Sequence, residues 1–220
     1  MTRISGNSLF GAQWRKPVDL AHASRLVSHG PTVMVGALHE GRRNIMSAAW
    51  SMPVEFTPPR IAIVLDKSTW TRELIVASGV LSIMVPCRAS ADLAYTVGSI
   101  GGKELEEAGD DKFRRYGVET FAGPELGLPF ATDCIAWLEC RLLREPGVDQ
   151  RYDTFFCEAV SASADTRVFS DGHWTLASAA PDLHTLHYIA AGTFAVASTT
   201  IHATMLVALN PVDDASRGSP

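Results

Sequence analysis

Short apolar runs rich in β-branched residues recur along this chain, and they do not alternate one for one with helical segments. Such runs, bounded by Gly, Pro, Asn or Asp, are typical of β-strands. A doubly wound parallel sheet would need a helix between successive strands. The pattern therefore predicts a mainly β chain with helices (α+β) and favours a barrel decorated by helices. We expect strands at 32–38, 44–50, 61–65, 80–85, 135–143, 154–161 and 166–170.

Helical patterns occur in three places. A short helix is expected at 18–30, and a second one at 70–77, with Ser68 as its cap and Gly79 at its end. The region 90–116 is polar and helical in pattern, with glycine interruptions. Three prolines are expected to break the chain before the third strand: Pro53, Pro58 and Pro59.

Length and charge exclude several classes of protein. The chain has 220 residues, 46% of them hydrophobic, which suffices for a core without metals or disulfides. Its 19 basic and 24 acidic side chains give a net charge of −5. No basic excess can drive binding to phosphate backbones, so we do not expect a nucleic-acid partner.

The segment 193–209 contains no formally charged residue. A membrane helix requires about 20 mainly apolar residues. This stretch is shorter and carries His202 together with several threonines and serines. It therefore favours a core strand or hairpin over a membrane segment.

The four cysteines, at positions 87, 134, 140 and 157, form no C-x-x-C pair and match no zinc signature. The first 17 residues contain no continuous apolar run of the kind found in signal peptides. We therefore expect reduced thiols in a cytoplasmic protein.

Most catalytic signatures are absent. No G-x-G-x-x-G or Walker loop follows a strand, and neither G-x-S-x-G nor H-E-x-x-H occurs. His184 and His187 could place two imidazoles on one helical face, as a metal site would require. Histidines at the surface or in the core are the alternative, and no metal is expected.

The segment from Asp66 to Glu73 stands where a buried strand ends and a helix begins. The first N–H groups of a helix lack partners, and the helix dipole favours an anion there. Lys67 adds a positive charge, and Ser68 and Thr71 add hydroxyl groups. A phosphate would suit this junction. The alternative is that Asp66 or Ser68 only caps the helix while Lys67 is solvated.

The segment 44–50 combines Asn44 and Met46 with the small residues Ser47, Ala48 and Ala49. Small side chains let a backbone come close to a flat ligand. The alternative is a strand packed tightly against a neighbour.

Together these segments resemble the flavin reductase-like FMN-binding family, which includes flavoredoxin and the small reductases of two-component monooxygenases. The resemblance covers Pro31 to Ala195 and rests on three motifs in the family's order: N-x-M-[ST]-A-x-W at 44–50, F-x-P-P at 56–59 and D-x-S-x-x-T at 66–71. Weaker blocks follow at 97–113, 134–143 and 186–195.

The resemblance implies a split β-barrel that binds FMN, or FAD in its place, as a homodimer with sites at or near the subunit interface. Asn44 would support its strand or contact the flavin, and the Lys112-Phe113 pair would belong to a loop near it. The isoalloxazine would be lined by Met46, Ser47, Ala48, Ala49 and Trp50. The phosphate would be held by Lys67, Ser68 and Thr71.

The resemblance also implies an extension with a short helix at 1–30, the barrel domain at 31–195, and a strand with a tail at 196–220. The implied activity is an NAD(P)H-dependent flavin reductase that passes electrons through FMN to a small-molecule or protein acceptor. Hydride transfer needs no general acid or base, so no catalytic side chain is expected. A non-enzymatic, flavoredoxin-like electron carrier is the first alternative. A split-barrel dimer that has lost its cofactor is the second.

Two positions depart from the family pattern. Met84 stands where Asn is common, and Tyr152 or Asp153 stands where a His is common. If that His positions nicotinamide or flavin in the family, these departures favour the electron carrier.

Overall fold

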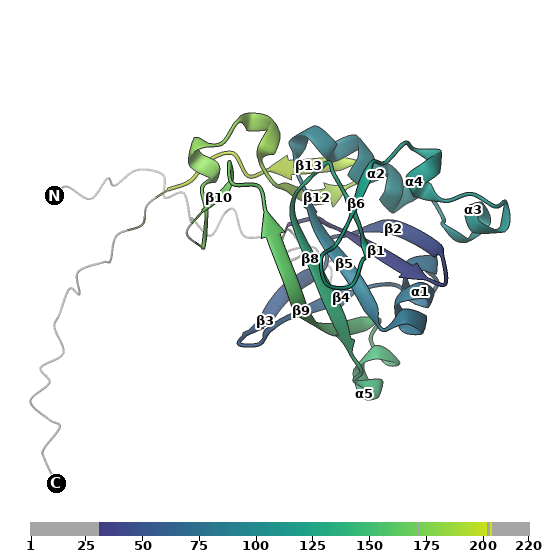
Figure 1. The fold of residues 1–220 in the computed structure, drawn as a ribbon. Helices are drawn as coiled ribbons and strands as arrows, with labels where there is room; N and C mark the ends of the chain where they lie inside the picture. The colour runs from purple at the N-terminus through teal and green to yellow at the C-terminus, as the bar shows by residue number, and fades with distance from the viewer. Residues whose placement is uncertain (1–30, 171, 202, 204–220) are drawn as a thin grey trace, which may run out of the picture.

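A seven-stranded antiparallel sheet organises the chain in the computed structural model, which describes residues 31–170, 172–201 and 203 (Figure 1). The strand order is β2-β1-β5-β8-β9-β4-β3. The strands are β1 (Val33–His39), β2 (Arg42–Ala48), β3 (Ser51–Phe56), β4 (Pro59–Val64), β5 (Val80–Pro86), β8 (Cys134–Leu143) and β9 (Thr154–Ala164).

The two outermost strands, β2 and β3, are neighbours in sequence. Only Ala49 and Trp50 separate Ala48 from Ser51, so the opposite edges of the sheet lie within about 11 Å of each other at this corner. The Val64 N–H donates to the Trp50 carbonyl at 2.9 Å and fixes the corner. The sheet therefore curls on itself, which confirms the expected split barrel decorated by helices.

Five α-helices accompany the sheet in the described residues: α1 (Trp70–Ser78), α2 (Ala91–Ser99), α3 (Lys103–Glu107), α4 (Lys112–Arg115) and α5 (Pro146–Asp149). Short 3-10 helices occur at η3 (Arg88–Ser90), η4 (Leu176–Ser178) and η5 (Pro181–Leu183). Helix α1 packs on β1 and β2, whereas α2 and α4 contact β2 from its other face (Figure 1). Three short hairpins complete the fold: β6 (Thr120–Ala122) with β7 (Pro129–Ala131), β10 (Phe169–Ser170) with β11 (His173–Trp174), and β12 (Leu186–Ala190) with β13 (Thr193–Val196).

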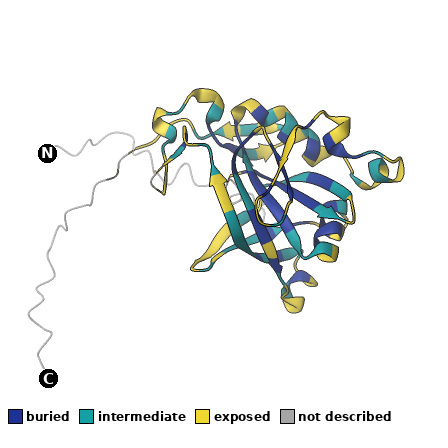
Figure 2. Cartoon of the chain, in the orientation of Figure 1, coloured by how far each residue is buried: buried dark blue, intermediate teal, exposed yellow. Residues whose placement is uncertain are grey.

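The core has two main parts, which appear as dark blue in Figure 2. The first fills the barrel between β1, β4, β5, β8 and β9 and includes Leu74 and Ile75 of α1. The second lies outside the barrel wall, where Met34 and Ile45 meet α2 and α4. All four cysteines are free and buried, as a set of core thiols would be.

Strand β3 was not expected from the sequence, because its prolines were interpreted as breakers. Pro53 lies inside β3, and Pro59 is the first residue of β4. An edge strand tolerates proline, since a missing N–H on its outer side breaks no bond of the ladder. The position of β3 at the end of the sheet therefore explains why the expectation failed.

The strand or hairpin expected from residue 193 onward is shorter in the structure. Strand β13 ends at Val196, and residues 197–201 form no regular element. Phe194 and Val196 pack against the second part of the core. The strand expected at 166–170 is reduced to β10. The helix expected at 18–30 and most of 196–220 lie outside the described residues.

Within the described ranges, no helix has the length and apolar character needed to cross a bilayer.

Candidate functional site

Strand β2 forms one edge of the sheet and has helices on both faces. Its outer side has no strand neighbour in the described part of the chain, so alternate backbone groups point away from the sheet. Asn44 and Met46 point toward the α1 face, whereas Ile45 and Ser47 point toward α2. This edge is therefore a place where backbone groups can meet a ligand.

A cavity of about 300 Å³ opens between the first turn of α1 and the segment that joins α2 to α4. Its wall includes eight polar or charged side chains: Asn44, Ser68, Thr69, Thr71, Ser99, Lys103, Glu104 and Lys112. Met46 also lines it. The structure thus brings together five residues that the sequence predicted for the site, namely Asn44, Met46, Ser68, Thr71 and Lys112.

The N-terminus of α1 lacks a side-chain cap. Its N-cap residue is Thr69, which makes no capping hydrogen bond, so the expectation that Ser68 caps the helix is wrong. The Asp66 carboxylate instead accepts hydrogen bonds from the hydroxyl and N–H of Ser68, at 2.6 and 2.8 Å. These bonds lower the pKa of Asp66. No side-chain cap therefore competes with an anionic acceptor at this end of the helix, where the Arg72 N–H already donates to the Thr69 carbonyl at 3.1 Å.

Lys112 is a buried cation at the wall of this cavity. Its side chain belongs to a residue only 2% exposed, and Nζ donates to the Val97 carbonyl at 2.6 Å. No carboxylate forms an ion pair with it in the described ranges, and burial lowers its pKa to about 8, against a weaker opposing effect of Glu104. A buried charge without a counter-ion is costly, so an anion in the cavity would be stabilised.

Asn44 joins the strand to the helix. Its side-chain amide donates a 2.9 Å hydrogen bond to Thr71 Oγ1, and both residues are buried. Gly102 lies directly against this amide, since a Cβ at Gly102 would stand 2.4 Å from Asn44 Nδ2. Glycine is therefore required for the segment after α2 to close over the cavity.

Trp70 contributes a donor that lacks an acceptor. Its indole Nε1 is buried and makes no hydrogen bond within the described residues. The Arg42 guanidinium lies 5.6 Å from the ring centroid, and the Lys103 ammonium lies 5.8 Å from it. Trp70 and Lys103 both line the cavity, so one of these two cations stands at the cavity wall.

A second cavity, of about 190 Å³, continues along the edge of β2. It is lined by Ser47, Ala48 and Ala49 and by three aromatic residues: Tyr95, Tyr188 and Phe194. Gly98 and Ser99 line both cavities, so the two form one groove along the edge.

The side chain of Ser47 packs tightly against α2, as the alternative interpretation of segment 44–50 expects. Its hydroxyl donates to the Ala94 carbonyl at 2.5 Å, and a Cβ at Gly98 would stand 3.0 Å from Ser47 Cβ. Ala48 and Ala49 remain open to the groove.

Trp50 does not line this groove. It lies beyond the barrel corner and lines a larger apolar cavity of about 770 Å³, together with Met52, Ile61 and Leu138. Ala49 lines both this cavity and the groove, so the two hollows meet at the barrel corner. The predicted isoalloxazine segment is therefore divided between the groove, which residues 46–49 line, and the apolar cavity, which Trp50 lines.

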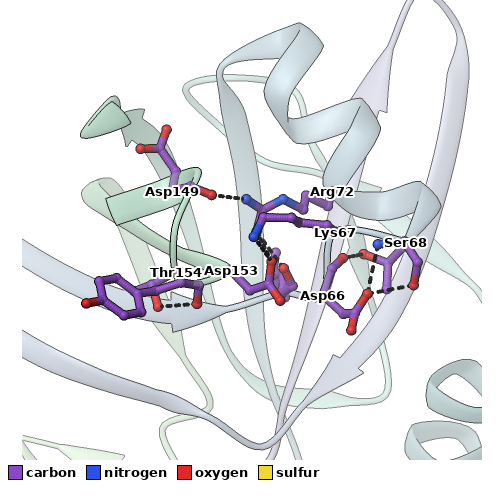
Figure 3. A network of polar contacts seen from close by, with 10 residues as sticks. Asp66, Lys67, Ser68, Arg72, Asp149, Asp153 and Thr154 are labelled. Atoms are coloured by element: carbon purple, nitrogen blue, oxygen red, sulfur yellow. Dashed lines mark hydrogen bonds and ion pairs between the residues drawn. The ribbon is translucent and has the colours of Figure 1, made fainter. Parts of the chain in front are cut away.

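Lys67 reaches toward Asp153 (Figure 3) and does not line the α1 cavity. Its Nζ lies 3.0 Å from Asp153 Oδ1, and it lines a separate hollow with Arg72. Arg72 donates to the carbonyls of Leu65, at 2.6 Å, and Asp149, at 2.5 Å. The structure therefore does not bring Lys67 together with Ser68 and Thr71.

Phe113, Met84 and Tyr152 also lie apart from the groove. Phe113 is in the core, with the Arg43 guanidinium 4.8 Å from its ring centroid. Met84 is fully buried, and its sulfur accepts a hydrogen bond from the Ala131 N–H at 3.1 Å. Tyr152 is exposed.

The two histidines do not share a helical face. His184 follows a short 3-10 turn and is buried, with Nε2 3.1 Å from the Leu176 carbonyl oxygen. His187 lies in strand β12. No group of three or more metal-ligating side chains is found within the residues the structure describes.

Lys103, Trp70 and Gly102 were not selected from the sequence. The double glycine before Lys103 was a usable signal, because consecutive glycines next to a charged residue are typical of a backbone that approaches a ligand.

Comparisons with known proteins agree with this architecture. The family described as flavin reductase-like domain matches residues 25–188. The uncharacterized protein YddH of Escherichia coli (strain K12) is 49% identical over 190 residues, which cover 85% of this chain and 97% of that protein. An FMN-binding domain of a flavin reductase-like enzyme from Shewanella baltica OS155 superposes with a TM-score of 0.75 at 43% identity, covering 85% of this chain and 96% of that one.

Flavoredoxin of Desulfovibrio vulgaris (Miyazaki F) has the same fold, with a TM-score of 0.64 at 22% identity over 82% of this chain and 91% of its own. The matched region includes both the barrel and the β2 edge with its flanking helices. The chain belongs to the flavin reductase-like domain family.

Proposed function

We propose that the chain binds FMN along the edge of β2, with the phosphate in the cavity at the N-terminus of α1. The observation that carries this proposal is Lys112, a buried ammonium group without an ion-pair partner in the described residues. A phosphate monoester carries a charge of about −1.5 to −2 at pH 7 and would supply the missing anion.

The other groups around the cavity fit the same ligand. The hydroxyl of Thr71, the uncapped N–H groups of α1 and the unpartnered indole N–H of Trp70 are donors, whereas the Ser68 hydroxyl would have to leave Asp66 before it could donate to a phosphate. A phosphate has only acceptor oxygens when ionised, so a wall of donors matches it. In this proposal Lys112 holds the phosphate, and Lys67 and Phe113 support the surrounding structure.

The ring would lie beside 46–49, where the backbone edge of β2 is open and Ala48 and Ala49 line the groove. Asn44 holds Thr71 in place, and Ser47 is fixed by α2. When bound, FMN would supply hydride transfer chemistry. The chain's own contribution is to anchor the phosphate, to orient the ring by backbone hydrogen bonds and to exclude water, and we assign no catalytic side chain.

We further propose that the chain is an NAD(P)H-dependent flavin reductase that delivers electrons to a small-molecule or protein acceptor. Support comes from the names of its relatives, since the Shewanella baltica protein is described as a flavin reductase-like enzyme. The test is anaerobic mixing of the FMN-loaded protein with NADH and with NADPH, followed by flavin absorbance near 450 nm. Rapid bleaching with either nucleotide is expected for a reductase. Bleaching by dithionite alone would instead identify an electron carrier.

We also propose a homodimer formed through the apolar cavity beside Trp50. The rim of this cavity and the adjoining β3–β4 hairpin expose Trp50, Met52 and Phe56, which are 49%, 60% and 95% exposed (Figure 2). Contiguous exposed apolar surface is typical of interaction sites. A second copy seated here would also reach Ala49, and with it the end of the flavin groove.

Sedimentation of the double variant Met52→Ser, Phe56→Ser tests the dimer. We expect a wild-type dimer at micromolar concentration and a monomeric variant. Tyr116→Ser removes an exposed aromatic residue outside the cavity and should leave the dimer intact. A monomeric wild-type chain would contradict the proposal.

A further inference from the structure

Lys103 stands at the mouth of the phosphate cavity and is held by an ion pair with Glu73. It is the first residue of α3, and its Nζ lies 3.1 Å from Glu73 Oε1 and 3.4 Å from Oε2. The same ammonium group lies 5.8 Å from the ring centroid of Trp70. Lys103 therefore connects α3 to the first turn of α1 across the opening.

We propose that Lys103 exchanges Glu73 for the phosphate of the bound flavin, and so supplies the second ammonium group of the site. The inference rests on the proposed FMN binding and adds to it a residue that closes the cavity. It also assigns to the Lys103–Glu73 pair the role of a latch, which is closed on Glu73 without ligand and on the phosphate with it.

The charges around the cavity support this assignment. Its charged lining residues are Lys103, Glu104 and Lys112. Without Lys103, one cation and one carboxylate would face the incoming phosphate, and their charges would cancel. Once Lys103 is released from Glu73, the wall has an excess of one positive charge. Lys103 therefore determines whether the cavity attracts or merely tolerates an anion.

The existing ion pair is weak enough to exchange. The side chains of Lys103 and Glu73 are 55% and 43% exposed, and exposed pairs of this kind contribute little to stability because water and salt screen them. A phosphate dianion offers more charge than a carboxylate, in a partly enclosed cavity where screening is weaker. Exchange from Glu73 to phosphate is therefore favourable.

The backbone before Lys103 fixes its position. Gly102 lies against the buried amide of Asn44, so the start of α3 is held at the cavity wall. Only the lysine side chain needs to move, and its flexible stem allows this without a change of fold. The chain thus combines a rigid anchor with a mobile charge.

The test compares FMN with riboflavin, which lacks the phosphate, as two probes of one site. Both are titrated into the wild-type chain and into Lys103→Met, with flavin fluorescence as the readout. We expect Lys103→Met to weaken FMN binding about tenfold and to leave riboflavin binding unchanged. Glu73→Gln frees Lys103 and should tighten FMN binding about two- to fivefold, again without effect on riboflavin.

Lys67→Met is the matched control. Lys67 is also a half-exposed lysine paired with a carboxylate, at 3.0 Å from Asp153, but it lines a different hollow. Its replacement should leave the FMN affinity unchanged. The latch is overturned if Lys103→Met weakens both probes equally or neither, or if Lys67→Met weakens FMN as much. A wild-type chain that binds neither flavin would overturn the proposed function itself, and the latch with it.

Discussion

Asn44 Nδ2 donates a 2.9 Å hydrogen bond to Thr71 Oγ1, and this bond joins the edge strand β2 to the first turn of α1. Because the Thr71 hydroxyl accepts from Asn44, its own proton is available for an acceptor in the cavity. The strand that would orient the flavin ring and the helix that would bind its phosphate are thus coupled by one buried contact.

Replacement of Thr71 by Val tests this coupling. The change preserves the shape of the side chain but removes the hydroxyl, so the buried Asn44 amide loses its acceptor. We expect the free energy of unfolding to fall by about 1–3 kcal/mol and FMN affinity to fall about tenfold. Urea denaturation and fluorescence titration measure the two effects. Thr96→Val, on the exposed side of α2, is the control and should change neither. An unaltered affinity in Thr71→Val would show that the hydroxyl does not touch the ligand.

Gly102 should not tolerate a side chain. A methyl group there would stand 2.4–2.7 Å from the side-chain atoms of the buried Asn44, so the strand or the loop would have to shift. We expect Gly102→Ala to lower the free energy of unfolding by about 1–3 kcal/mol and to weaken FMN binding. Gly147→Ala, where nothing lies within 4 Å of the added carbon, should be neutral. Equal behaviour of the two variants in thermal denaturation would contradict the packing described for Gly102.

Lys112 should make FMN binding dependent on pH. Burial lowers its pKa to about 8, so the ammonium form that attracts phosphate is lost above that pH in the free protein. Bound phosphate favours the ammonium form and raises the pKa. Affinity should therefore be constant between about pH 7 and 8 and then fall by up to about tenfold per pH unit, until the pKa of the complex is reached.

Lys112→Met provides the control for this pH dependence. The variant should bind FMN more weakly at pH 7, and its affinity should not change between pH 7 and 9. A wild-type affinity that is flat across the same range would place Lys112 outside the phosphate site.

Glu139 should limit stability in acid. The carboxylate is fully buried and accepts hydrogen bonds from the Ser161 hydroxyl and from three backbone N–H groups, those of Glu125, Leu126 and Leu128. Burial raises its pKa, but these bonds outweigh burial and the pKa lies below its ordinary value. A lowered pKa in the folded state means that the stabilisation is present above about pH 4.3, the unfolded value, and is lost as pH falls through the folded value.

Glu139→Gln should abolish this component. Because the amide retains only part of the acceptor capacity, we expect a loss of about 1–3 kcal/mol at pH 7 and a weaker dependence of unfolding on pH below about 4.3. The exposed Glu119→Gln is the matched control. Parallel stability profiles for wild type and Glu139→Gln would contradict the role of this carboxylate.

The local part of the site could be predicted from sequence, and the part assembled by tertiary contacts could not. Ser68 and Thr71 follow from a strand that runs into a helix, which short-range pattern indicates. Lys67 belongs to the same junction, but its direction is set by Asp153, a partner distant in sequence.

The difference between local sequence pattern and tertiary contact also explains why Lys103 and strand β3 were not predicted. Lys103 reaches the cavity only because Gly102 packs on Asn44, and no local pattern shows that contact. Strand β3 was missed because Pro53 breaks an interior strand but is tolerated at an edge, and edge position is a property of the whole sheet. Family resemblance identified Lys112, whereas its burial without an ion-pair partner among the described residues required the structure.

The cavity between α1 and Lys112 is proposed to bind the phosphate of FMN. The most direct measurement is a titration of the flavin-free wild-type chain with FMN and with riboflavin at pH 7. We predict one FMN per chain, bound about 100-fold more tightly than riboflavin, as two charge-assisted hydrogen bonds would provide. Equal affinity for the two flavins, or no binding of FMN, would contradict a phosphate site in this cavity.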